Sequence, residues 1–237
     1  MSFRVKKDYF GLSTGQNSKF VITSSDENKS ASTAEAQDDK GDVVAIMTYG
    51  ETSAPSCSYV LRGDAQTGTI NMGTEIQSDT KHYVITELSI STAAGTPPSI
   101  TVTGEEVPTG SHCSEYCYYN VPSESIECCH HAQALFGLSW SGIGSGFYVT
   151  QANYSVSCEL TKATKDGETV SYDITNGTIS AQITIQGTGT DTTPTFTAPT
   201  GWVITSPLSL SNPDSGYDTW SISLQKTLSH ATPAVTP

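Results

Sequence analysis

Residues 83–104 read YVITELSISTAAGTPPSITVTG, and this stretch decides the fold class. Small polar residues alternate with apolar ones on both sides of a break at residues 95–98, GTPP. Alternation with a period of two is typical of a β-strand with one buried face, and Gly and Pro mark the turn between two such strands. The stretch therefore predicts a β-hairpin, with Pro97 and Pro98 at its turn or at a sheet edge.

A similar stretch returns near the C-terminus, where residues 202–225 read WVITSPLSLSNPDSGYDTWSISLQ. It repeats the aromatic residue, the Val-Ile-Thr triplet, an alternating run, a turn-rich break and a second alternating run. Two copies of one strand-turn-strand unit indicate an internal duplication. We therefore expect a mainly β protein with two β-sandwich or barrel-like lobes, over residues 43–104 and 147–228.

Composition narrows the functional classes. The chain has 237 residues, only 15% of them charged, with a formal net charge of −13. This charge repels nucleic-acid phosphates, so we expect no specific nucleic-acid binding. We expect no membrane segment and no secretion signal, because no apolar run has the required length. Six cysteines in a chain made in the cytosol are then expected to be free thiols.

The pattern divides the chain into five parts. Residues 1–42 are predicted as an extended N-terminal arm, 43–122 as the first β lobe with an acidic connector, 123–146 as a short helix and a Gly-rich turn, 147–229 as the second β lobe, and 230–237 as a C-terminal tail. Ser123 suits a helix N-cap, and Glu124 and Glu127 suit the first turns of that helix. Gly137 suits its end.

Two stretches of the chain are strongly acidic. Residues 26–51 hold seven acidic residues and two lysines, and residues 101–131 hold five glutamates and no Lys or Arg. The first stretch is interpreted as a solvated loop, or as an arm that becomes ordered only against a neighbouring subunit.

One cluster has residue types that bind metals. It comprises His112, Cys113, Cys117, Cys128, Cys129, His130 and His131. Thiolate and imidazole are the ligands that zinc prefers, but the spacing fits no familiar zinc motif, and neighbouring residues on a helix point about 100° apart. Free thiols beside a partly buried helix are the favoured interpretation, with a structural metal or a disulfide as alternatives.

Catalytic residues are not identified by any pattern. The adjacent pairs Asp38-Asp39 and Glu105-Glu106 would face opposite ways on a strand, and no G-x-S-x-G motif occurs. We therefore expect no enzyme activity, no catalytic or cofactor-binding residues and no cofactor.

Three stretches together resemble the tail tube proteins of tailed phages. They are the polar arm leading into GDVVA at residues 41–45, PSITVTG at 98–104, and NPDSGYDTWSISLQKTL at 212–228. The resemblance implies a virion structural protein, assembled in the host cytoplasm, that contacts copies of itself and other virion proteins. It implies stacked rings around a channel that passes DNA, for which the acidic stretches 26–51 and 105–127 are candidate lining. A capsid decoration, head-fibre or surface-adhesion protein is the alternative.

Overall fold

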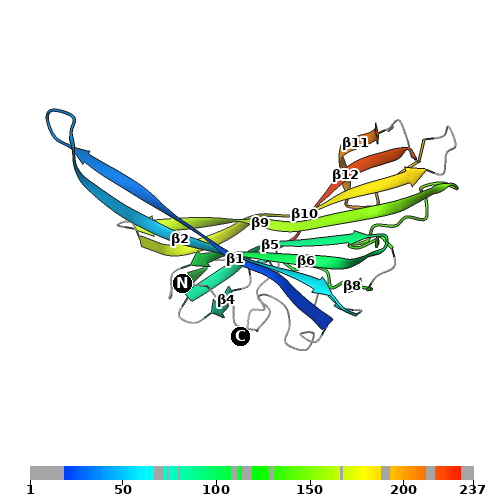
Figure 1. Cartoon of the computed structure of the whole chain (residues 1–237), viewed down its shortest axis with the longest axis horizontal. Helices are drawn as coiled ribbons and strands as arrows, with labels where there is room; N and C mark the ends of the chain where they lie inside the picture. The colour runs from blue at the N-terminus through cyan, green and yellow to red at the C-terminus, as the bar shows by residue number, and fades with distance from the viewer. Residues whose placement is uncertain are drawn as a thin grey trace.

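The computed structural model describes residues 19–63, 65–66, 72–73, 75–78, 81–107, 112–113, 119–128, 131–165, 168–187, 193–211 and 217–230 (Figure 1). The described chain is mainly β, as the sequence predicts. Its strands are β1 (Phe20–Gln37), β2 (Val43–Leu61), β3 (Ala65–Gln66), β4 (Glu75–Ser78), β5 (Lys81–Ala93), β6 (Thr96–Val107), β7 (His112–Cys113), β8 (Ser125–Ile126), β9 (Phe147–Lys165), β10 (Glu168–Gly187), β11 (Val203–Ser211) and β12 (Thr219–Thr227).

One large sheet contains almost all of these strands. Its order is β1-β2-β6-β5-β9-β10-β12-β11, with β4 attached to β5 and β7 attached to β10. The two predicted lobes are not confirmed as separate bodies, because β5 pairs antiparallel with β9 and joins both halves in this sheet. The two predicted hairpins do form, as β5 with β6 and as β11 with β12.

The two halves of the sheet follow the same strand order. In the first half β1 pairs with β2, and the hairpin of β5 and β6 joins through β6 to β2. In the second half β9 pairs with β10, and the hairpin of β11 and β12 joins through β12 to β10. Each half therefore arranges its four main strands as first, second, fourth and third.

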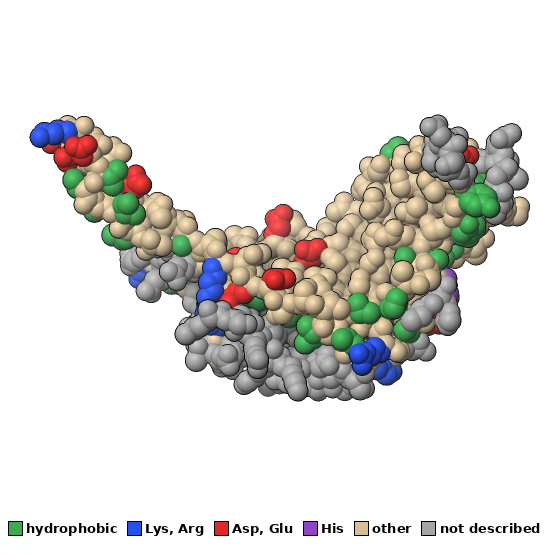
Figure 2. Space-filling model, viewed as in Figure 1, with side chains coloured by type: hydrophobic (Ala, Val, Ile, Leu, Met, Phe, Trp, Pro, Cys, Tyr) green, Lys and Arg blue, Asp and Glu red, His purple; other side chains and the backbone are tan. Residues whose placement is uncertain are grey.

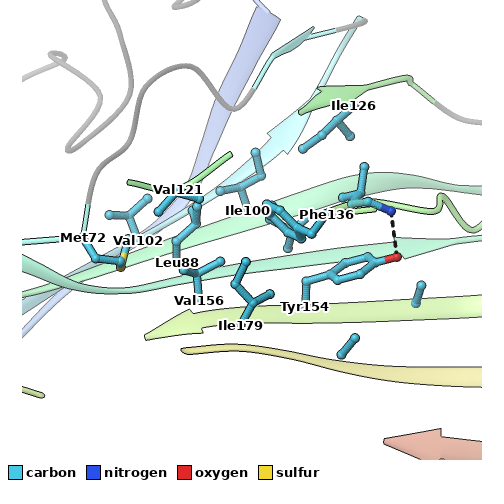
Figure 3. Close-up of a cluster of buried hydrophobic side chains, with 14 of the residues drawn as sticks. Met72, Leu88, Ile100, Val102, Val121, Ile126, Phe136, Tyr154, Val156 and Ile179 are labelled. Carbon is cyan, nitrogen blue, oxygen red and sulfur yellow. Dashed lines mark hydrogen bonds between the residues drawn. The ribbon is translucent and has the colours of Figure 1, made fainter. Parts of the chain in front are cut away.

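The core lies on one face of this sheet. A single row of paired residues crosses the central strands, and all of its members are buried: Tyr59, Ile100, Ile90, Tyr154, Ala181 and Leu224. Chain segments outside the sheet cover this face, and Met72, Val121, Ile126 and Phe136 point into it (Figure 3). Burial of such side chains contributes about 1.5–3 kcal/mol each, so this layer stabilises both halves together.

The predicted helix is wrong for the described residues between 123 and 146, which contain the short strand β8 and otherwise irregular backbone. Side chains bind backbone groups here instead. The Gln133 side chain donates to the Glu127 carbonyl at 2.6 Å and accepts from the Glu127 N–H at 2.9 Å, while Glu124 accepts from the Phe136 N–H at 2.9 Å. Phe136 and Gly137 both have positive φ, which no α-helix allows.

The predicted arm is also different from expectation. From Phe20 onward it is the strand β1, which pairs with β2 along its length, while residues 1–18 lie outside the described part of the chain. The two strands leave the body as a long hairpin (Figure 1). Residues 28–48 are exposed on both faces of the hairpin, so the outer part of this hairpin has no core of its own.

Candidate functional surface

The face of the sheet opposite the core is lined by hydroxyl groups. A row of paired residues runs across five strands through Ser58, Thr101, Ser89, Ser155 and Ser180. These residues alternate along each strand with the buried apolar ones, so the same alternation that builds the core also builds this polar face. We call it the hydroxyl face.

Short side chains on the hydroxyl face bind one another across strands. Ser58 and Thr101 oxygens lie 2.9 Å apart, and the Ser91 hydroxyl donates to the Asn153 Oδ1 at 2.7 Å. Ser89 and Ser155 both donate to the Glu87 carboxylate, at 2.9 and 3.1 Å. Cross-strand pairs of this kind add to the stability of a sheet.

A shallow depression of about 480 Å³ lies on this face. Hydroxyl and amide side chains from β5, β6, β9, β10 and β12 line it, and none of the lining residues is charged. Separate acidic side chains lie elsewhere on the sheet surface, whereas the Lys and Arg side chains visible in Figure 2 lie at its margins. Such a surface attracts neither phosphate nor any other anion strongly.

The two acidic stretches differ in their exposure and in their ion pairs. In the first, Asp38 and Asp39 are exposed at the tip of the β1–β2 hairpin, where the Asp38 carboxylate accepts from the N–H groups of Lys40 and Asp42. In the second, Glu106 lies 2.7 Å from the Lys81 ammonium and Glu105 lies 2.6 Å from that of Lys162. These ion pairs neutralise part of the predicted acidic connector, so it is no bare acidic surface.

The Cys/His cluster is not brought together by the described chain. β7, which holds His112 and Cys113, pairs with β10 at Ser171 and Tyr172. Cys128 lies 3.7 Å from the Leu61 carbonyl, at the other end of the sheet. The registers place these two positions about eleven residues apart along the strands, or roughly 35 Å. No single metal ion can bind at both places.

Four members of the cluster remain, Cys117, Cys129, His130 and His131. Cys117, Cys129 and His130 lie outside the described residues, and His131 is exposed. Cys128 is disulfide-bonded, which corrects the expectation of a free thiol at this position; its contact with Leu61 is therefore no thiol hydrogen bond. Within the described ranges, no group of three or more His, Cys, Asp or Glu side chains is arranged to hold a metal.

Two other cysteines, Cys57 and Cys158, are free and buried. Burial raises the pKa of the Cys158 thiol to about 12, so this thiol stays protonated at neutral pH. A protonated, buried thiol is a poor nucleophile. Both cysteines lie within the core, and both are free thiols, as the sequence predicts.

Comparison with known proteins gives no family for this chain: no protein-family model and no curated protein matches it. The described residues contain no helix that is long and apolar enough to span a membrane. The hydroxyl face is not among the features predicted from the sequence, although the alternation of Ser and Thr with apolar residues is its signal.

Proposed function

We propose that this chain is a non-enzymatic structural protein that assembles with copies of itself, as a subunit of a phage tail tube. The projecting β1–β2 hairpin is the observation that carries this proposal. Its outer part exposes Val43, Val44, Ile46 and Met47, with Val44, Ile46 and Met47 each more than 60% exposed. A two-stranded hairpin is at best marginally stable in water alone. A hairpin that is held away from the body and exposes several apolar side chains suits a contact with a neighbouring subunit.

The hydroxyl face supports the same proposal. A channel that passes DNA must not retain it, and binding to DNA depends mainly on Lys and Arg contacts with phosphates. A broad surface of Ser, Thr, Asn and Gln with scattered carboxylates meets this requirement. We propose that the hydroxyl face, rather than the acidic connector, lines the channel, in a virion assembled in the host cytoplasm.

The repeated strand order supports a duplicated subunit. We propose that the two halves derive from one four-stranded unit, so that each chain contributes two equivalent units to the assembly.

The disulfide of Cys128 favours a second candidate, a decoration, fibre or adhesion protein on the virion surface, because disulfides persist in such oxidising surroundings.

Size-exclusion chromatography with light scattering and negative-stain microscopy test the proposal. Purified full-length protein should form rings or tubes, whereas discrete monomers or trimers support the surface protein instead. The combined variant Val44→Ser, Ile46→Ser, Met47→Ser should remain folded, because these side chains are exposed, and should assemble less. Val170→Ser is the matched control and should assemble normally, because Val170 is an exposed valine at the end of the β9–β10 hairpin.

A further inference from the structure

The sheet has two outer edges that no described strand covers. β11 forms one edge and β1 forms the other, and they lie well apart in Figure 1. Natural proteins protect exposed edge strands with charged residues, prolines or covering segments. β11 reads VITSPLSLS and has no charge, and the first part of β1, residues 20–25, has none either. Pro207 removes one donor from β11, within the irregularity between Ser206 and Ser209.

The chain already contains one junction of the kind that these edges offer. At the middle of the sheet, the third strand of the first half, β5, pairs antiparallel with the first strand of the second half, β9. β11 is the third strand of the second half, and β1 is the first strand of the first half. The same junction rule would join β11 to the β1 of another molecule.

We infer that the outer edge of β11 pairs antiparallel with the outer edge of β1 in a second copy of this chain, continuing the sheet between molecules. The inference rests on the proposed self-assembly and specifies the strands through which two copies contact each other. Such a contact is heterologous, so repeating it generates a ring if it closes and a filament if it does not.

The register follows from the equivalent residues of the two halves. Trp220-Ser-Ile-Ser-Leu224 corresponds to Pro98-Ser-Ile-Thr-Val102, so Ser209, which pairs with Ser221, takes the place of Ser91, which pairs with Ser99. The next residue, Leu210, then takes the place of Thr92. Thr92 pairs with Ala152, which lies one strand from Ile183 and two strands from Ile222. Ile100 is the counterpart of Ile222 in the first half, and Ile22 lies two strands from Ile100. Ile22 therefore takes the place of Ala152. Leu210 should therefore pair with Ile22 of the next molecule.

This register keeps both faces of the sheet continuous. Leu210 pairs with the buried Trp220 and Ile22 with the buried Tyr59, so both lie on the core face. At the next paired position, across the irregularity between Ile22 and Ser24, Ser209 would meet Ser24; the internal counterparts of these two residues, Ser91 and Asn153, are hydrogen-bonded at 2.7 Å. A slip of one residue would place Leu210 against the hydroxyl face. The junction would also cover Leu210, which is 56% exposed in the single chain.

Cysteine crosslinking of the full chain tests this pairing. The double variant Leu210→Cys, Ile22→Cys, after oxidation, should give a ladder of covalent oligomers on a non-reducing gel. Each single variant should give no more than the wild-type background. The control Leu210→Cys, Val170→Cys should also give none, because Val170 is 49% exposed but lies on β10 and not on β11 or β1. A covalent dimer from Leu210→Cys alone would mean symmetric β11–β11 pairing and would overturn the inference.

Hydrogen exchange of the wild-type protein provides a second test that needs no substitution. Amides of β11 and of residues 20–25 should become protected on assembly. If assemblies form while both edges exchange as in the monomer and the double variant gives no ladder, the inference is wrong and the proposed function stands. If the protein stays monomeric at every concentration, both are wrong.

Discussion

The hydroxyl of Tyr154 allows a quantitative test of how the core face is covered. Tyr154 is 2% exposed; its hydroxyl donates to the Gln133 carbonyl at 2.6 Å and accepts from the Leu135 N–H at 3.1 Å (Figure 3). Burial raises the pKa of this phenol, so it remains a neutral donor. Tyr154→Phe leaves two buried backbone groups without this partner, at about 1–3 kcal/mol per unsatisfied group. Because the carbonyl keeps a second lone pair, we expect a total loss of about 2–4 kcal/mol.

Urea denaturation monitored by tryptophan fluorescence measures this loss. The midpoint should fall while the slope of the unfolding free energy with urea stays constant, since the variant changes stability and not the surface exposed on unfolding. Tyr148→Phe is the matched control: its hydroxyl donates to Gln186 at 2.9 Å, but the residue is 44% exposed, so water replaces the partner and the cost should stay below about 0.5 kcal/mol. Equal midpoints for the two variants would refute the role assigned to Tyr154.

Two further substitutions probe packing and ionisation. Gly177→Ala should cost about 1–3 kcal/mol in urea denaturation, because the new Cβ would lie 2.6 Å from the Tyr119 ring, whereas Gly142→Ala, with no atom within 4 Å, should be neutral. The Cys158 thiol has a pKa of about 12 in the folded chain and 9.0 as its ordinary value, so its contribution to stability is intact below pH 9 and is lost as the pH rises toward 12. Between these values wild-type stability should fall by up to about 1.4 kcal/mol per pH unit more than that of Cys158→Val; identical alkaline curves would argue against a raised pKa.

Strand identity could be predicted from the sequence because it depends on local alternation. Residues 83–91 and 99–103 are strands in the fold, as expected, whereas the turn is confined to residues 94–95 and the predicted break at 96–98 is already part of β6. Residues 147–160, within β9, and 178–186, within β10, are strands inside the region predicted as the second β lobe. A period of two fixes which side chains share a face, whatever lies beyond the strand.

The helix prediction failed because its local signals were outweighed by contacts from distant residues. Ser123, Glu124 and Gly137 suited a helix, but the N–H of residue 136 binds Glu124 and the Trp202 indole donates to the Phe136 carbonyl at 3.2 Å. Trp202 is 66 residues from Phe136, so no window of sequence contains this contact. Local helix propensity is worth only a few tenths of a kcal/mol per residue, and tertiary hydrogen bonds in a buried layer exceed it.

The sequence alone determined the β class, the two hairpins and the polar face hidden in their alternation, because each depends on neighbours within a few residues. Only the tertiary structure decided that both halves share one sheet, that the acidic arm is a projecting hairpin, and that His112 and Cys113 lie far from Cys128. Those outcomes depend on which strand edges pair, and strands with nearly identical Ser/Thr-rich sequences offer many pairings of similar energy. The choice among them is made by the shared apolar face, whose burial rewards one continuous sheet covered by one layer.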